Sequence, residues 1–332
     1  MDKRQIFTVI LILGLVITGI FVNLKPKQDY LLQAEPLIKK VTQNTKLIDL
    51  NTDHNQALDV SEFAKNHGIK APEILVNFDT HSDIYLNYPV IAEGSAGVEN
   101  WINELIAKNP ELKEIYWVMP YEEAKDLNLQ TLFAENDYHL IPRGKATPFY
   151  GNSMNPNIRW LHFVFKPLFK EPFSQEFLIN TQTGRINEIP SDKKLYDYLF
   201  TPINQHKKVK IVTCTEKTLP DFEGKKVFLS IDADYTSNSG FDTAEKFSFI
   251  KSQKDIEKTF YSIFKTVNEK NMKPEIISLS LSPQYLPEFH HEYVATIFYY
   301  ILRISRKEDV ITTYTRKYDN DPNYLEKKYG KY

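Results

Sequence analysis

Three side chains that could bind a metal ion alternate at the end of an apolar segment. Asp79, His81 and Asp83 lie in the sequence NFDTHSD (residues 77–83), directly after Ile74-Leu75-Val76. Alternate residues of a β-strand point to the same face, so these side chains converge if the strand geometry continues to its end. Two carboxylates and an imidazole in one place are stable around a cation, because the cation cancels the repulsion and uses the lone pairs. The spacing therefore predicts a site for a divalent metal ion.

A second acidic pair follows another apolar segment far downstream. Asp232 and Asp234 come directly after the run 227–231, which reads VFLSI. Alone, such a pair could form a turn or a helix cap. In open α/β sheets, however, ligands bind beyond the carboxyl ends of the strands, where both acidic clusters lie. If the two strands are neighbours, we expect all five side chains to meet in one crevice.

His54 is a sixth candidate ligand. It lies between a predicted strand at residues 46–50 and a predicted helix at 56–66. A lone histidine in a loop is more often a solvated side chain than a ligand. Its neighbour Asp53 has an alternative role as the N-cap of the following helix.

The elements that position these residues alternate between strands and helices. This rhythm predicts a three-layer α/β/α domain with a mostly parallel sheet. Residues 159–165 and 176–181 break the rhythm and are expected to form an antiparallel pair in or beside the sheet. The predicted strands are 46–50, 73–78, 114–118, 208–213, 227–231 and 275–281, and the predicted helices are 31–41, 56–66, 98–108, 121–127, 256–269 and 291–306.

The amino terminus differs from the rest of the chain. After a short tail at 1–5, residues 6–24 carry no charge, and this length is close to the ~20 residues that span a bilayer. We expect a single-pass membrane anchor that contacts lipid, with a cleaved signal peptide as the alternative. Residues 25–45 are then a stalk, 46–317 one globular domain and 318–332 a tail. A short leading tail before a long domain usually places that domain outside the cytoplasm, in the periplasm or the extracellular space.

Composition excludes several classes of protein. The chain has 332 residues and a net charge of -2, which gives no reason to expect a nucleic-acid partner. It has one cysteine, so an intramolecular disulfide is impossible. Neither of the glycine-rich phosphate-binding motifs GxxxxGK[ST] and GxGxxG occurs.

The order of the metal-ligand motifs resembles that of the ureohydrolase superfamily, which includes arginases and agmatinases. That superfamily has an Asp-His pair, then a strand-end Asp-x-His-x-Asp, then a strand-end Asp-x-Asp, as this chain does. The sequence is most similar to a little-characterised branch that includes peptide arginases, over most of residues 53–287. The matching segments are 53–58, 77–83, 98–102, 115–120, 229–235 and 280–285.

The resemblance implies a site for two manganese ions, which suit a carboxylate-rich shell. In that arrangement Asp79 and Asp232 bridge both ions, and the catalytic residues that orient the bridging water or take its proton are Asp83 and Asp234. The implied metal ligands are His54 and Asp83 for one ion, His81 and Asp234 for the other, and Asp79 and Asp232 for both.

The substrate is less well defined by the resemblance. Members of the superfamily grip a guanidinium with a glutamate at a late strand end, whereas residues 280–283 here read SLSP. Glu93, Glu99 and Glu288 are candidate replacements. We expect hydrolysis of a linear C–N bond in a peptidyl-arginine or other small guanidino substrate. An amide deacetylase with a single zinc ion and a non-catalytic membrane-anchored binding protein with a vestigial metal site are the alternatives.

Other histidines and the tryptophans receive simpler assignments. His139, His290 and His291 could act as proton shuttles near neutral pH. The tryptophans Trp101, Trp117 and Trp160 are expected to pack in the core or at its rim.

Overall fold

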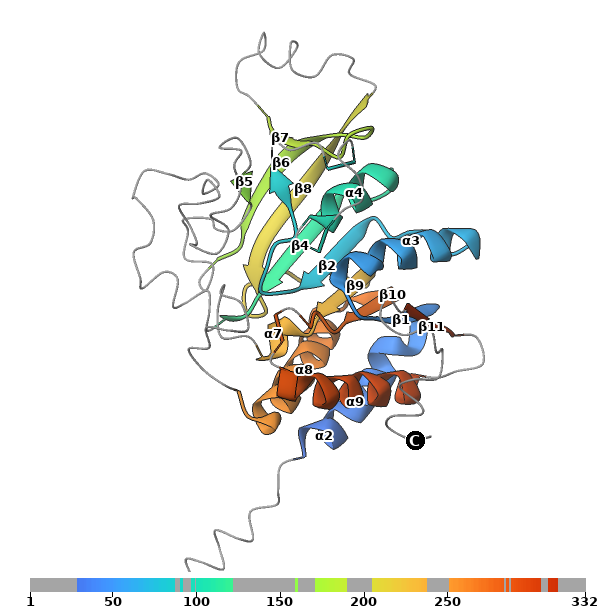
Figure 1. Cartoon of the computed structure of the whole chain (residues 1–332), viewed down its shortest axis with the longest axis vertical. Helices are drawn as coiled ribbons and strands as arrows, with labels where there is room; N and C mark the ends of the chain where they lie inside the picture. Colours follow the sequence, from blue (N-terminus) through green and yellow to red (C-terminus); the bar gives the residue numbers. More distant parts are fainter. Residues whose placement is uncertain are drawn as a thin grey trace, which may run out of the picture.

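A computed structural model describes most of the predicted domain (Figure 1). The described residues are 29–86, 90–91, 97–98, 100–121, 159–160, 171–189, 205–237, 251–283, 285–286, 288–305 and 310–315. Within them, 11 strands form a single sheet in the order β11-β1-β10-β9-β2-β4-β8-β6-β7-β3-β5.

The strands that run from β11 to β8 in this order are all parallel to one another. Strands β1 and β2 are buried along their whole length, because helices cover both faces of the sheet. The parallel strands are β1 (Leu47–Asn51), β2 (Ile74–Phe78), β4 (Glu114–Met119), β8 (His206–Thr215), β9 (Lys226–Asp232), β10 (Lys273–Ser280) and β11 (Ile311–Thr315). The strands predicted at 46–50, 73–78, 114–118, 208–213, 227–231 and 275–281 are confirmed.

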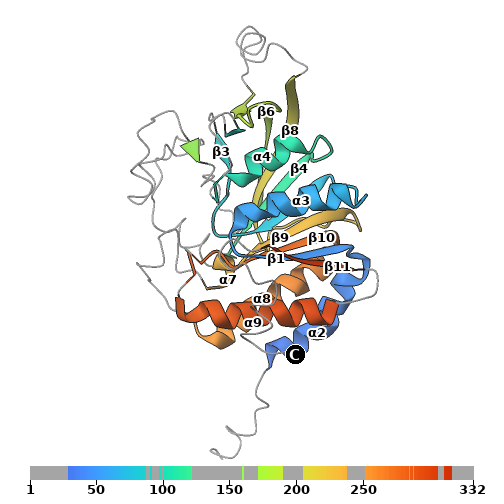
Figure 2. The same cartoon turned by 45° about the vertical axis from the view of Figure 1, so that its right-hand side comes forward.

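Helices lie on both faces of the parallel strands (Figure 2). One apolar cluster joins one face of the sheet to α3 and α4, and a second joins the opposite face to α2, α8 and α9. The α/β class with a mostly parallel sheet is confirmed, and the layering is compatible with a three-layer α/β/α arrangement. The helices are α2 (Tyr30–Val41), α3 (Ala57–Asn66), α4 (Trp101–Lys108), α7 (Asp234–Ser237), α8 (Gln253–Glu269) and α9 (Glu288–Ser305), with 3-10 turns η1 (Thr42–Asn44) and η2 (His54–Gln56).

The other edge of the sheet is mixed. Strand β6 (Phe173–Asn180) runs antiparallel to both β8 and β7 (Ile186–Glu188). The expected pairing of 159–165 with 176–181 is wrong for the described residues, because β5 (Arg159–Trp160) instead pairs with β3 (Tyr85–Leu86). Strand β6 instead pairs with β7, which follows it after a tight turn. Gly184 has a positive φ of 69° in that turn.

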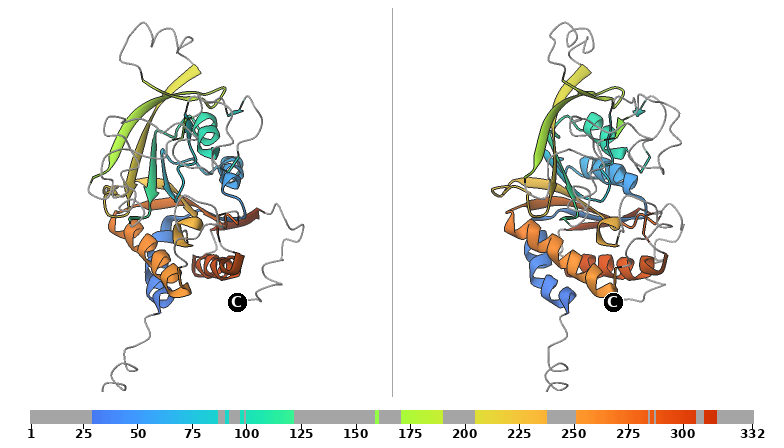
Figure 3. Two further views of the ribbon diagram at one scale, coloured as in Figure 1. Left: turned by 60° about the vertical axis from the view of Figure 1, so that its left-hand side comes forward. Right: turned by 90° about the vertical axis from the view of Figure 1, so that its left-hand side faces the viewer.

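Helix α2 belongs to the globular core, where the sequence placed a stalk. Asp29 caps the helix, and Ala34 and Ile38 are fully buried. The helix packs beside α8 (Figure 3). Its apolar face explains the difference, since a solvated stalk has no need of one.

The expected membrane anchor at 6–24 lies outside the described residues, as do the tail at 318–332, residues 161–165 and the predicted helix at 121–127 beyond its first residue. None of the helices in the described ranges combines the length and apolar character that crossing a bilayer requires.

Candidate metal centre

The two acidic clusters lie on neighbouring strands, as the metal hypothesis requires. Strands β2 and β9 are parallel, with Phe78 beside Ile231. Asp79, which follows β2, and Asp232, which ends β9, therefore lie at the same edge of the sheet. Hydrogen bonds from Asp79 N to Val118 O (3.2 Å) and from Ala233 N to Ser280 O (2.8 Å) continue the ladder one step past the strands.

His54 reaches this edge from the far side of β10. It begins the turn η2, which a capping box of Asp53 and Gln56 stabilises. The side-chain oxygen Oε1 of Gln56 accepts hydrogen bonds from the backbone N–H groups of Thr52 (2.9 Å) and Asp53 (3.3 Å). Asp53 thus has the capping role that the sequence offered as its alternative, and the cap fixes the direction of His54.

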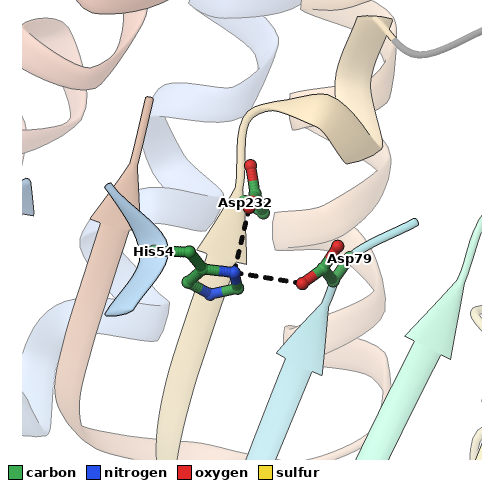
Figure 4. A group of neighbouring side chains, drawn as sticks. All are labelled: His54, Asp79 and Asp232. Carbon is green, nitrogen blue, oxygen red and sulfur yellow. Dashed lines mark ion pairs between the residues drawn. The ribbon is translucent and has the colours of Figure 1, made fainter. Parts of the chain in front are cut away.

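The first cluster surrounds His54 Nδ1 with three carboxylate oxygens, and Figure 4 shows two of them, from Asp79 and Asp232. Oδ2 of Asp79 lies 3.0 Å away, and Oδ2 of Asp83 and Oδ2 of Asp232 each lie 2.9 Å away. All four side chains are at most 5% exposed. We call this group the His54 cluster.

The second cluster, which we call the His81 cluster, contains His81, Asp79 and Asp234. His81 Nδ1 lies 2.7 Å from Asp234 Oδ2 and 3.8 Å from Asp79 Oδ1. Backbone N–H groups hold its carboxylates: His81 N donates to Asp79 Oδ1 (2.7 Å) and Thr80 N to Asp234 Oδ1 (3.3 Å).

Asp79 is common to both clusters, with Oδ2 toward His54 and Oδ1 toward His81. The expected convergence of Asp79, His81 and Asp83 by strand alternation alone is wrong. Strand β2 ends at Phe78, and the chain then turns, with Asp83 at a positive φ of 52°. His81 and Asp83 therefore lie in different clusters, with Asp79 as their common member.

The donor set fits metal binding. His54 Nδ1 is buried and forms no hydrogen bond within the described residues, although three carboxylate oxygens lie about 3 Å away. A spacing of about 3 Å is what neighbouring ligands have around an octahedral ion with bonds of about 2.1 Å. His54, Asp79 and Asp232 can hold one ion, and Asp79, His81 and Asp234 can hold another.

Charge crowding in these clusters shifts the pKa values of their members. Burial, followed by repulsion from neighbouring carboxylates, raises the pKa of Asp79 and of Asp234 to about 7. Burial opposes the charging of His81, but the Asp234 carboxylate outweighs it and raises the pKa to about 9. The pKa of His54 is likewise raised, against burial, by Asp232 and its neighbours, and His54 in turn lowers the pKa of Asp232 against the effect of burial. A divalent cation would replace these protons.

Four side chains that the sequence did not identify hold the His54 cluster in place. Trp101 Nε1 donates to Asp83 Oδ2 at 2.5 Å, and Ser282 Oγ donates to Asp232 Oδ2 at 2.5 Å. Asn77 Nδ2 donates to Asp79 Oδ2 at 3.1 Å, and Ser230 Oγ lies 2.8 Å from His54 Nε2. Hydrogen bonds of this kind orient metal ligands, so these four side chains belong to the site.

Two of the four left a signal in the sequence. Asn77 and Ser230 precede Asp79 and Asp232 by two residues, so each lies on the same strand face as a ligand. Both are fully buried polar residues in otherwise apolar strands. They belong to one row across the sheet, in which Asp49, Ser278, Ser230, Asn77 and Trp117 are successive register partners on β1, β10, β9, β2 and β4. Trp101 and Ser282 gave no such signal.

The tryptophan assignment needs correction in part. Trp101 and Trp117 are fully buried, as packing residues are, but their indole N–H groups also contact the site. Trp117 Nε1 donates to the backbone oxygen of Asp79 at 3.0 Å. For Trp160 the structure describes the backbone only.

The proposed shuttles and acid replacements are only partly described. Glu93, Glu99, His139 and the side chain of Glu288 lie outside the described part. His291 Nε2 lies 2.7 Å from the Leu286 carbonyl oxygen. His290 is buried, and its ring centroid lies 4.3 Å from that of Phe289. Neither of these contacts is to a metal cluster.

Comparison with known proteins adds no identification. No protein-family model matches the chain, and no curated protein matches it. The resemblance to the ureohydrolases therefore stays a prediction from the sequence motifs.

Proposed function

We propose that the protein is a binuclear, metal-dependent hydrolase of linear C–N bonds. The observation that carries this proposal is the position of Asp79, whose two carboxylate oxygens face two different histidines. A carboxylate placed in this way is suited to bridge two ions, and two-metal sites are typical of hydrolases. The carboxylate-rich shell favours manganese, with zinc as the alternative.

The assignment of ligands follows the two clusters. One ion is held by His54 and Asp83, together with the shared Asp79 and Asp232. The other is held by His81 and Asp234, together with the same shared pair. Asp232 Oδ2 lies beside His54, while its Oδ1 accepts the backbone N–H of Asp234 at 3.0 Å, which ties Asp232 to both clusters.

The chemistry requires a nucleophilic water and a group that handles its proton. Two divalent ions, once bound by these residues, would supply a water activated as a nucleophile near neutral pH. Asp83 and Asp234 each belong to one cluster only, so we assign them to orient this water or to hold its proton. His81 fixes one side of Asp234, and Trp101 fixes one side of Asp83.

The proposed substrate is a guanidino group in peptide-linked arginine or a similar compound. Its chemical basis is attack on a trigonal carbon, and the choice of a guanidino carbon rests on the resemblance. The residues after β10 present Ser282, whose hydroxyl already donates to Asp232. Residues 280–283 read SLSP, so this segment offers no carboxylate that could hold free arginine. We also propose that residues 6–24 anchor the domain to a membrane, on its extracytoplasmic side.

A single-zinc deacetylase is the second candidate. It needs fewer ligands and would leave His54 or Asp234 outside the metal shell. Both residues lie within 3.0 Å of a cluster partner, and this favours two ions.

Metal content of the purified full-length protein separates the candidates. About two manganese ions per chain support the binuclear hydrolase, one zinc ion supports the deacetylase, and none supports a binding protein. Release of urea from an arginine-containing peptide, with free arginine and an acetyl-lysine peptide as comparisons, tests the reaction. Asp79→Ala and Asp232→Ala should abolish both metal content and turnover, and full occupancy in both variants would overturn the two-ion site.

A further inference from the structure

Asp83 reaches the His54 cluster in a backbone conformation that needs support. Its φ of 52° is in the left-handed region, which residues other than glycine rarely adopt. Its side chain is buried and faces other carboxylates. Repulsion between carboxylates and the unfavourable φ both oppose this position, so other contacts must hold it.

The first turn of α4 supplies those contacts. Trp101 Nε1 donates to Asp83 Oδ2 at 2.5 Å, and the Trp101 ring centroid lies 4.8 Å from that of His54. Two residues on, Asn103 forms two hydrogen bonds with the backbone of Tyr85, accepting its N–H at 2.9 Å and donating to its carbonyl oxygen at 2.7 Å. Asn103 also donates to Gly184 O at 3.0 Å, which joins α4 to the turn between β6 and β7.

We propose that Trp101 is a positioning residue that holds the Asp83 carboxylate against His54. The indole can only donate, and it donates to the Asp83 oxygen that lies 2.9 Å from His54 Nδ1. A hydrogen bond to an ionised acceptor is among the stronger kinds in proteins. Asn103 fixes the backbone two residues after Asp83, so the carboxylate has little freedom to turn away.

The consequence for metal binding rests on the proposed function. Loss of an orienting hydrogen bond typically lowers metal affinity by about 10- to 100-fold. Asp83 Oδ2 lies 2.9 Å from His54 Nδ1, so the loss should fall mainly on the ion of the His54 cluster. The ion of the His81 cluster should keep its affinity.

The first test uses metal-free, full-length protein, so its outcome is independent of metal binding. The chain has 3 tryptophans, and Trp→Phe variants assign their indole N–H signals by NMR. We expect the Trp101 signal to lie downfield of the others and to exchange slowly with solvent. Asp83→Ala should move it to the ordinary range. A Trp101 signal that is unchanged in Asp83→Ala would overturn the inference, even if Trp101→Phe itself fails to fold.

The second test titrates Mn²⁺ into Trp101→Phe, which keeps the aromatic packing and removes the N–H group. Trp117→Phe is a comparison variant of the same type, because Trp117 donates to the backbone oxygen of Asp79 and not to a ligand carboxylate. We expect the first variant to lose affinity for one of the two ions and the control to lose much less. The double variant Trp101→Phe with Asp83→Ala should be no worse than Asp83→Ala alone. Equal losses in the two tryptophan variants, or additive losses in the double variant, would reduce Trp101 to a packing residue.

The two tests separate the two proposals. If the wild-type protein binds no metal but the indole signal responds to Asp83→Ala, the proposed function fails and the positioning role of Trp101 stands. If two ions bind and the signal does not respond, the positioning role fails and the proposed function stands.

Discussion

The His54 cluster and the His81 cluster share Asp79, yet they are held together by different kinds of group. Side chains from several elements support the His54 cluster: Trp101 of α4, Ser282 after β10 and Ser230 of β9. Backbone N–H groups of Thr80 and His81, directly after β2, support the two carboxylates of the His81 cluster. One cluster is a product of tertiary packing, and the other is a product of two strand ends.

This difference separates what mutation can change from what the fold fixes. A backbone N–H remains after any substitution other than proline, so the carboxylates of the His81 cluster keep their donors. Each side-chain donor of the His54 cluster can be removed singly. The His54 cluster should therefore be the more sensitive to substitutions outside the ligands themselves.

Removal of the shared ligand should have the largest effect, since it breaks both clusters at once. We expect Asp79→Ala to reduce manganese content from about two ions per chain to nearly none, because each ion loses a charged ligand. Elemental analysis after dialysis measures this. Glu176→Gln removes a charge from an exposed ion pair and should leave metal content unchanged. Retention of one tightly bound ion in Asp79→Ala would show that Asp79 serves a single cluster.

The two histidine variants should separate the clusters. His54→Ala and His81→Ala each remove the only nitrogen ligand of one cluster, so each should leave about one ion per chain. The remaining ion should be the one whose histidine is intact, which the pH dependence of binding and paramagnetic effects on Trp101 can identify. Loss of both ions in either variant would mean that the ions bind only as a pair.

Metal-free protein should become less stable as the pH rises. The pKa of Asp79 and of Asp234 is raised from 3.8 to about 7 and that of His81 from 6.5 to about 9, so the folded chain holds these protons more tightly than the unfolded chain. Each contribution to stability is present at low pH and is lost as the pH rises through the folded-state pKa. In chelator, Tm should therefore fall between about pH 5 and about pH 9.

Excess Mn²⁺ should reverse that slope, because the ion binds the deprotonated ligands. All three groups, Asp79, Asp234 and His81, belong to the His81 cluster, so His81→Ala should flatten the fall above neutral pH. Thermal unfolding across this range, with chelator and with Mn²⁺, gives both slopes. A Tm in chelator that rises with pH would contradict the charge crowding that both clusters share.

The same comparison explains how much the sequence could predict. The ligands of the His81 cluster follow directly after β2 and β9, so the parallel order of the sheet was enough to bring them to one edge, although strand alternation was not. The strands themselves were predicted within a few residues, because apolar runs buried on both faces are a strong signal.

The supports of the His54 cluster could not be predicted in this way. Trp101 comes from a helix that is 18 residues from Asp83, and Ser282 is 50 residues from Asp232. Which indole or hydroxyl meets which carboxylate depends on packing between layers, and no local pattern encodes that. The turn that gives Asp83 its positive φ was also missed, because NFDTHSD contains no glycine to mark it.

A pair of serines on β10 and just after it gives the finest test of the comparison. Ser282 is buried, has a φ of 42° and donates to Asp232 Oδ2, while its N–H donates to Thr52 O at 2.8 Å. It thus ties Asp232 to the chain that leads to His54. Ser280 is equally buried, but its hydroxyl forms no hydrogen bond within the described residues.

Ser282→Ala should weaken metal binding by about tenfold, or about 1.4 kcal/mol, because a buried ligand carboxylate loses its donor. Ser280→Ala also removes a serine hydroxyl, but one that forms no hydrogen bond within the described residues, so it should change the affinity for Mn²⁺ little. Isothermal titration with Mn²⁺ compares the two variants. The loss should be greater for the ion at His54 than for the ion at His81, because the freed oxygen of Asp232 is the one beside His54. An equal loss at both ions would mean that Asp232 couples the clusters so tightly that the difference in their supports has no effect on affinity.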